Sequence, residues 1–177
     1  MSGYCAYVAT ITDRDDVDKM YHDHHYGVRI ENDNELFGRL LMEINQAGLS
    51  WRTILKKEKG FRKAYDNFSI KKVARYTEKD ITRLMNDTEI IRNKLKVHAA
   101  IYNAYQITQL QKDYTSFRAW LDLHAKELQY DKEKWVKLFK KHFKFVGGEI
   151  VGEFLMSISL LPNAHHKTCK VYIQKNR

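Results

Sequence analysis

Apolar residues recur at steps of three and four positions along most of the chain, and this spacing limits the possible fold more than any other feature. It predicts helices that each bury one face, while the two-residue alternation typical of strands is nearly absent. The single proline, Pro162, leaves long segments free to form helices. We therefore expect an all-α fold assembled from many short helices.

The predicted helices follow polar residues of the kind that cap helix N-termini. One helix is expected over 34–47, after Asp33 and Asn34. No linker rich in proline, glycine or serine divides the sequence, so residues 1–177 are expected to form one domain. The other expected helices start near Ser69, Thr77, Asn93, Ser116 and Asp131, and the last runs from Gly147 and Gly148 to Pro162.

The charge balance favours a polyanionic partner. The chain has 31 lysines and arginines against 22 acidic residues, a formal net charge of +9, and basic surfaces attract nucleic acid and acidic membrane surfaces. The positive net charge is weak evidence by itself, since many lysine-rich cytosolic proteins bind no nucleic acid. No apolar run approaches the about 18–20 residues of a membrane span, and residues 1–16 lack the basic start of a signal peptide. We expect a cytoplasmic protein with no membrane partner.

Glu43 is the first candidate for a functional side chain. It lies seven residues after Leu36 and three after Leu40, so on a helix it shares their apolar face. A carboxylate on such a face is costly unless it is paired or opens into a cavity. Two interpretations stay open: a glutamate at the edge of the face that bends out to solvent, or a pocket carboxylate tuned by burial and hydrogen bonds.

The residues after this glutamate suit a loop that presents apolar side chains to a partner. The predicted helix ends at Gly48, and Leu49 and Trp51 follow it closely. The alternative is that Trp51 is an ordinary core residue.

Both cysteines of the chain have a histidine nearby, which suggests a metal site. Cys5 precedes the histidine-rich stretch 21–26, and His165 lies four residues before Cys169, so on a helical turn this pair could bind one ion. Cys5 and one N-terminal histidine would complete the two-cysteine, two-histidine set of a structural zinc site. The spacing does not match a zinc finger. The alternative is two unrelated thiols with surface histidines, since a disulfide is disfavoured in the cytosol.

Residues 90–97 place basic and amide side chains in a tight turn between two predicted helices, with apolar residues on either side. Arg92, Asn93, Lys94 and Lys96 could bind phosphate there, together with backbone N–H groups at the start of the second helix. The alternative is a solvated charged turn.

Six stretches of the sequence match one known family in the same order: YHDHHYG (21–27), EINQAGLSWRTILKK (43–57), FRKAY (61–65), IIRNKLK (90–96), FKFVG (143–147) and AHHKTC (164–169). On these stretches the chain resembles 3-methyladenine DNA glycosylase I, a bacterial base-excision enzyme, over essentially its full length. The resemblance implies a helix-hairpin-helix fold with a base pocket between two helical lobes. It also implies hydrolysis of the N-glycosidic bond of 3-methyladenine in duplex DNA, without lyase activity and with other N3-alkylated purines as further candidates.

The resemblance places the family's metal and DNA-backbone contacts on particular residues. Its zinc ligands fall on Cys5, His22, His165 and Cys169, which would tie the chain ends together with one structural ion. Its backbone-binding hairpin falls on residues 90–97. Alkylated double-stranded DNA is the implied partner, and nothing calls for a second subunit, so we expect a monomer.

Base recognition in the resembled family falls on Glu43, Tyr21 and Trp51, and the loop that fills the gap left by the extruded base falls on Gly48 and Leu49. N3-methylated adenine is cationic and its glycosidic bond is already labile, so the site must chiefly recognise the flipped base. Electron-rich ring faces attract the cation, and the carboxylate accepts hydrogen bonds from its N–H groups. Free 3-methyladenine is the product.

The sequence departs from the family pattern at several positions. Tyr7 and Tyr26 stand where the family has tryptophan, and both stay pocket candidates because tyrosine keeps a stacking face. Glu89 stands where glycine is usual in the hairpin, and 148–157 reads GEIVGEFLMS in place of small and hydroxyl residues. We expect the same substrate class with an altered pocket fit.

Two alternatives to this mechanism remain. Asp113 lies where many helix-hairpin-helix glycosylases place a water-activating aspartate, but Gln111 to Tyr114 is expected to be a polar loop and the resembled family lacks that aspartate. The chain could also be a catalytically inactive, zinc-stapled helical DNA-binding module. Such a module would not need Glu43, Tyr21 and Trp51 together, so their joint presence favours the enzyme.

Overall fold

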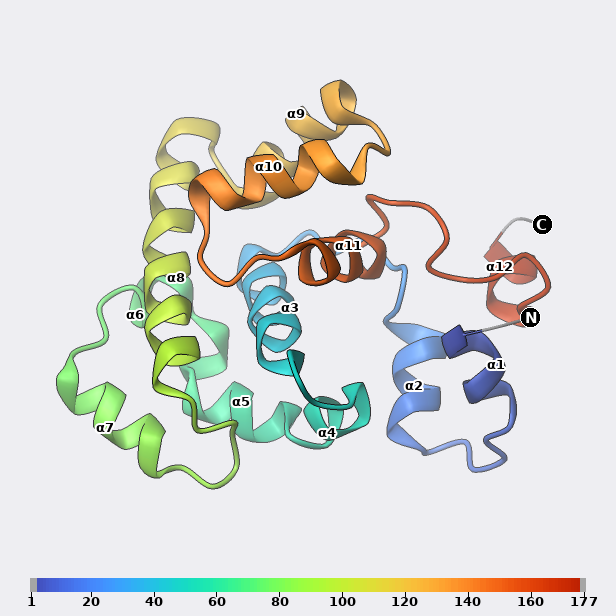
Figure 1. Ribbon diagram of the computed structural model, residues 1–177, viewed down its shortest axis with the longest axis horizontal. Coiled ribbons are helices and arrows are strands. Elements are labelled where there is room, and N and C mark those ends of the chain that lie inside the picture. Colours follow the sequence, from blue (N-terminus) through green and yellow to red (C-terminus); the bar gives the residue numbers. More distant parts are fainter. Residues whose placement is uncertain (1–2, 176–177) are drawn as a thin grey trace.

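The computed structural model describes residues 3–175, and within them it is all-helical, with no β-strand (Figure 1). This confirms the all-α fold expected from the spacing of apolar residues. The helices are, in chain order, α1 (Gly3–Ala9), α2 (Val17–His24), α3 (Asp33–Gln46), α4 (Trp51–Lys56), α5 (Glu58–Ala64), the short helix η1 (Asp66–Phe68), α6 (Ile70–Val73), α7 (Glu78–Asn86), α8 (Lys94–Tyr114), α9 (Phe117–Leu128), α10 (Lys132–His142), α11 (Gly148–Ser157) and α12 (Lys170–Lys175).

Side-chain caps begin several helices where the sequence places them. Asn93, Ser116 and Asp131 each accept a hydrogen bond from a backbone N–H in the first turn of α8, α9 and α10. Thr77 and Asp80 form a capping box at the start of α7. Short-range capping therefore fixes where these four helices start.

The start of α3 differs from the prediction. Asn32 is the N-cap, in place of Asp33 or Asn34, because its side chain accepts a hydrogen bond from the Asn34 backbone N–H at 2.9 Å. The Asp33 carboxylate instead accepts hydrogen bonds from the backbone N–H groups of Phe117 and Arg118, at 2.8 and 2.9 Å. Asp33 thus joins the start of α3 to the start of α9.

The last long helix is shorter than predicted, since α11 ends at Ser157 and does not reach Pro162. Ser159 adopts a left-handed φ of 64°, and the Leu160 N–H donates to the Leu155 carbonyl at 2.8 Å, so a turn closes the helix. Proline also disfavours a helical backbone in the residue before it.

α3 lies at the centre of the fold (Figure 1), and its residues from Leu36 to Asn45 are all buried. It packs against α4, α6, α8, α9 and α11. Gly38 permits this close packing, because a Cβ at that position would lie 2.3 Å from a ring carbon of Phe68. Arg39 and Glu43 are therefore ionisable side chains within the buried part of this helix.

The two ends of the chain meet beside α2. In Figure 1, α1, α2 and α12 lie together at the right, so the first and last described helices are neighbours. Cys5, Cys169 and Val171 form a small buried cluster apart from the main core. Residues distant in sequence are thereby brought next to the pocket described below.

None of the helices within residues 3–175 has the length and apolar content needed to cross a membrane.

Candidate binding pocket and metal site

A cavity of about 610 Å³ opens where the N-terminal helices meet α3, α4 and α11. Of the predicted pocket residues, Tyr7 does not line this cavity. Its side chain is 46% exposed, and its hydroxyl donates to Asp18 Oδ2 at 3.4 Å. The walls carry four aromatic rings and two carboxylates, from Tyr4, Tyr21, Tyr26, Trp51, Glu43 and Glu153.

The aromatic rings form a continuous wall. Tyr21 meets Trp51 edge-on, with ring centroids 5.1 Å apart, and its ring lies 5.7 Å from that of Tyr26. Tyr4 contacts Tyr26 in a T-shaped arrangement at 5.9 Å. Burial raises the pKa of the three tyrosine hydroxyls, so all three are neutral at physiological pH. Such π faces attract a flat, cationic ring.

Arg39 fixes Tyr21 from behind. Its Nη1 donates to the Tyr21 hydroxyl at 2.8 Å, and its guanidinium lies 4.8 Å from the centre of the Tyr21 ring. The sequence analysis missed Arg39, although it lies four residues before Glu43 and so on the same face of α3. The arginine orients the aromatic wall.

Glu43 is buried and faces the cavity, which favours the pocket interpretation over a glutamate bent out to solvent. Burial raises its pKa from 4.5 to about 8; the Arg39 charge opposes this shift and the Glu153 charge adds to it. No hydrogen bond contributes to the shift. The carboxyl group is therefore protonated at neutral pH unless a cation binds beside it.

Trp51 begins α4 and is held firmly. Its neighbour Arg52 pairs with Asp16 at 2.7 Å and with Asp18 at 2.6 Å, which ties α4 to α2. The Nε1 of Trp51 is buried, and within residues 3–175 it is the single buried side-chain nitrogen or oxygen without a hydrogen-bond partner. An unpaired buried donor costs about 1–3 kcal/mol. Its position in the cavity wall therefore suggests a ligand with an acceptor atom.

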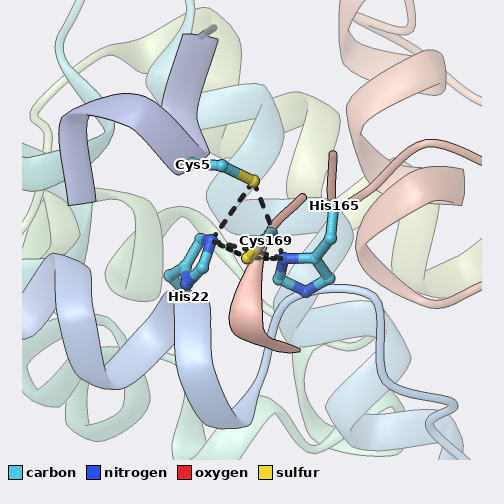
Figure 2. Close-up of side chains that lie close together, drawn as sticks. All are labelled: Cys5, His22, His165 and Cys169. Carbon is cyan, nitrogen blue, oxygen red and sulfur yellow. Dashed lines mark hydrogen bonds between the residues drawn. The ribbon is translucent and has the colours of Figure 1, made fainter. Parts of the chain in front are cut away.

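Four side chains from opposite ends of the chain point toward one another, as Figure 2 shows: Cys5, His22, His165 and Cys169. All four are buried, and their donor atoms lie within 4.8 Å of one another. His22 Nε2 lies 3.3 Å from both Cys5 Sγ and His165 Nδ1, and 3.7 Å from Cys169 Sγ. Tetrahedral zinc with its usual bond lengths separates nitrogen and sulfur donors by about 3.3–3.8 Å. The predicted residues therefore fit a metal ion.

The groups around these donors fit as well. His22 Nδ1 lies 2.7 Å from Asp23 Oδ1, and His165 Nε2 lies 3.0 Å from the Tyr26 carbonyl oxygen. Metal-bound histidines commonly orient their second nitrogen in this way. The expected helical turn between His165 and Cys169 is absent, because α12 begins only at Lys170. A turn, closed by the Cys169 N–H donating to the His166 carbonyl at 2.8 Å, brings the two ligands together instead.

The basic turn connects α7 to α8 and carries exposed Arg92, Asn93 and Lys94. Ile90 and Val97 are buried on either side of it, as the pattern indicates. Asn93 caps α8 by accepting a hydrogen bond from the backbone, so the first N–H groups of that helix lie at the same surface.

Lys96 does not belong with these exposed side chains, and the expectation that it binds phosphate is corrected. It is 7% exposed, and its Nζ donates to the carbonyl oxygens of Asn45 and Ala47, both at 3.0 Å. These carbonyls end α3 and have no partner within the helix. Lys96 therefore fastens the end of α3 to α8.

The turn between α3 and α4 projects from the surface. Gly48 adopts a φ of +85°, which residues with a Cβ rarely take, and Leu49 is 41% exposed. The sequence predicted that Leu49 is presented outside the core, and its exposure confirms this. Trp51 instead packs partly against the core while its indole lines the cavity.

Asp113 lies away from this cavity. The segment from Gln111 to Tyr114, expected in a loop, forms the last turn of α8, and the chain leaves the helix at Thr115 with a φ of 74°. The Asp113 side chain is exposed there and does not line the cavity. This position favours the interpretation that it has no catalytic role.

Comparison with known sequences agrees with the resemblance. A family model described as Methyladenine glycosylase matches residues 11–136. The DNA-3-methyladenine glycosylase 1 of Escherichia coli (strain K12) is 33% identical over 168 residues, covering 86% of this chain and 89% of that protein. The DNA-3-methyladenine glycosylase of Haemophilus influenzae is 29% identical over 165 residues, covering 84% of this chain and 89% of that protein.

The fold is also similar to solved structures. One, on the recognition of 3-methyladenine by 3-methyladenine DNA glycosylase I from Staphylococcus aureus, matches with a TM-score of 0.83 at 32% identity over 96% of each chain. Another, a variant of 3-methyladenine DNA glycosylase I in complex with 3-methyladenine, matches with a TM-score of 0.83 at 31% identity. It covers 97% of this chain and 98% of that chain.

The buried Glu43 should make stability depend on pH in a definite direction. Its pKa is raised from 4.5 to about 8, so its contribution to stability is complete below about pH 4.5 and is lost as the pH rises through about 8. Glu43→Gln removes this titration. We expect the melting temperature of the wild type to fall relative to that of Glu43→Gln as the pH rises through this range. Thermal unfolding of both proteins measures the difference, and a difference independent of pH would contradict the raised pKa.

Proposed function

Because the chain belongs to the methyladenine glycosylase family, we propose that it removes 3-methyladenine from double-stranded DNA by hydrolysing the N-glycosidic bond of a flipped nucleotide. It is a DNA glycosylase of base-excision repair. The observation that carries this proposal is the cavity, which combines π faces with a buried carboxylate that has no cationic partner within hydrogen-bond distance. A flat, cationic base with N–H groups is the ligand that satisfies both.

The chemistry asked of the protein is mainly recognition. Extrusion of a nucleotide costs roughly a few kcal/mol, least for a damaged base. Once flipped, the cationic base lies against the faces of Trp51 and Tyr21, and its positive charge favours the ionised form of Glu43. The carboxylate then accepts hydrogen bonds from the base. The labile base departs as free 3-methyladenine, and water takes its place on the sugar, so no lyase step follows.

The DNA backbone is held by the hairpin of α7 and α8. Arg92, Asn93 and Lys94 supply exposed donors, and the N-terminus of α8 adds backbone N–H groups. Gly48 and Leu49 form the tip of the turn after α3, which fills the gap left by the extruded base. Because Lys96 fastens this turn to the start of α8, the hairpin and the tip approach DNA as one unit.

We assign one structural zinc ion to Cys5, His22, His165 and Cys169. The set of two cysteines and two histidines and the spacing of their donor atoms support this assignment. The other ring nitrogen of each histidine lies within hydrogen-bond distance of an oxygen, on Asp23 for His22 and on Tyr26 for His165, which supports it further. A bound ion stabilises the meeting of the two chain ends and takes no part in base release. Residues 1–177 then work as a single domain whose two helical lobes flank the pocket.

The proposed partners are alkylated duplex DNA as substrate and free 3-methyladenine as product, with the enzyme acting as a monomer. Its similar proteins are bacterial, and we place it in the cytoplasm with the DNA on which it acts. An inactive DNA-binding module would not need a cavity of this composition. Release of methylated bases from DNA separates the two functions directly.

Glu43→Gln should slow the release of 3-methyladenine from methylated DNA, because it removes the charge that favours a cationic base. A charge-assisted hydrogen bond is worth about 1.5–3 kcal/mol, so the loss should be about tenfold to a hundredfold. Asp113→Asn is the control and should release the base at the wild-type rate. Chromatography of the freed bases measures both. Loss of release in Asp113→Asn with normal release in Glu43→Gln would replace this mechanism by a water-activating aspartate.

Lys94 and Lys96 should respond differently to substitution. Lys94→Ala removes an exposed cation, so it should weaken binding to every duplex and reduce the slope of log affinity against log salt by about one unit. Lys96→Met should lower the melting temperature and leave that slope unchanged. Fluorescence anisotropy with undamaged duplex over a range of salt concentrations tests both variants. An unaltered slope in Lys94→Ala would mean that Lys94 does not contact a phosphate.

Protein purified without chelators should contain close to one zinc ion per chain, and chelation should lower its melting temperature substantially, since the ion closes a loop of nearly the whole chain. Cys169→Ser should lower both metal content and melting temperature. His166→Ala is the matched control, because its ring contacts Thr168 and lies outside the cluster. Elemental analysis and thermal unfolding decide the matter, and a metal-free wild type would end the assignment.

A further inference from the structure

Glu153 is a second carboxylate in the pocket wall, and the mechanism above makes no use of it. It lies on α11, within the segment 148–157 where the sequence departs from the family pattern. Its side chain is partly buried, and burial raises its pKa. The pocket of this chain therefore holds two acidic groups where recognition by Glu43 alone would need one.

The orientation of Glu153 is fixed by a single hydrogen bond. The Tyr26 hydroxyl donates to Glu153 Oε2 at 3.1 Å. Lys132 on the neighbouring helix α10 pairs with Glu149 at 3.2 Å, and its charge opposes the raised pKa of Glu153 without an ion pair between the two. One carboxylate oxygen is thus occupied by Tyr26, while no cation among the described residues forms an ion pair with the group.

The two carboxylates also act on each other. The charge of Glu153 adds to the raised pKa of Glu43, so the pair is close enough for repulsion when both are ionised. Neutral side chains of the same shape would avoid this cost. A ligand that is cationic and carries N–H donors on more than one edge would stabilise both ionised carboxylates, and a flipped alkylated purine has this chemistry.

We propose that Glu153 is a second specificity-determining residue of the pocket, which accepts an N–H hydrogen bond from the cationic alkylated base at an edge that Glu43 does not serve. Tyr26 is its positioning residue. This inference rests on the proposed function, because it assumes that an alkylated base enters the cavity. The segment 148–157, which differs from the family pattern, would then strengthen the preference of the pocket for positively charged bases.

The test is single-turnover release of 3-methyladenine from methylated duplex DNA. Glu153→Gln keeps the volume and an oxygen that accepts the Tyr26 hydroxyl, but removes the charge. Release should slow by about tenfold in both Glu153→Gln and Glu153→Ala, with melting temperatures that stay near the wild type. Glu127→Gln, on α9 with an exposed side chain outside the cavity, is the matched control and should leave the rate unchanged.

Tyr26→Phe supplies a readout that a structural role would not give. The substitution removes the hydroxyl that orients Glu153, so it should slow release in the wild-type background and cause no further loss when combined with Glu153→Gln. Additive losses would mean that Tyr26 acts independently of Glu153 and would overturn its positioning role.

The outcomes separate the inference from the function on which it rests. Normal release by Glu153→Gln, with or without slow release by Glu153→Ala, would reduce Glu153 to a support for Tyr26 and overturn the inference alone. A wild-type protein that frees no 3-methyladenine would overturn the proposed function itself. Should Glu153→Ala fail to fold, the isosteric Glu153→Gln variant still decides between recognition and support.

Discussion

The burial of the central part of α3 is the constraint on which the rest of the structure depends. Ten consecutive residues of this helix, from Leu36 to Asn45, are buried, and Glu43 among them lines the cavity. Each charged group among them must therefore be satisfied inside the protein. Arg39 is satisfied by the Tyr21 hydroxyl and ring, whereas Glu43 has only the cavity. The site exists because a central helix holds a carboxyl group that no ion pair within the described residues satisfies.

The pocket is assembled from parts of the chain that are distant in sequence, and Tyr26 connects them. Its ring lines the cavity, its hydroxyl orients Glu153, and its carbonyl oxygen lies 3.0 Å from His165. Tyr26 thus joins the Cys/His cluster to the aromatic wall, and Tyr4 adds a ring contact with His22 at 5.6 Å. The Cys/His cluster therefore holds the tyrosine that bounds the pocket, and Cys5 and His165 of the cluster line the cavity as well.

Much of this architecture is local in origin and could be predicted. The apolar spacing around Glu43 and the caps at Asn93, Ser116 and Asp131 depend on neighbours within one or two turns. Helices of six to eight residues such as α1, α2 and α4 escaped prediction, because tertiary packing stabilises them more than their own pattern does.

Long-range contacts are what the sequence could not supply. Lys96 lies in a segment whose sequence is typical of a solvated charged turn. Its contacts with the Asn45 and Ala47 carbonyls, 51 and 49 positions away, form only in the folded chain. Glu153 and the exposed Glu149 are glutamates one turn apart on the same helix, so the sequence does not distinguish them. In the fold, Glu153 accepts a hydrogen bond from Tyr26, whereas Glu149 is exposed. The cluster of cysteines and histidines was easier to predict, because the chain has only two cysteines and each has histidines nearby in the sequence.

The meeting of the chain ends has a consequence for synthesis. Asn163 to Lys167 contribute to the pocket wall, and they follow α3 and the α7–α8 hairpin in the sequence, so a ribosome adds them later. The contacts of α8 with α3 and with α7 do not involve that wall. The hairpin proposed to bind the DNA backbone is therefore translated before the pocket is complete. On the proposed function, the part of the chain that binds any duplex is made before the part that distinguishes one base from another.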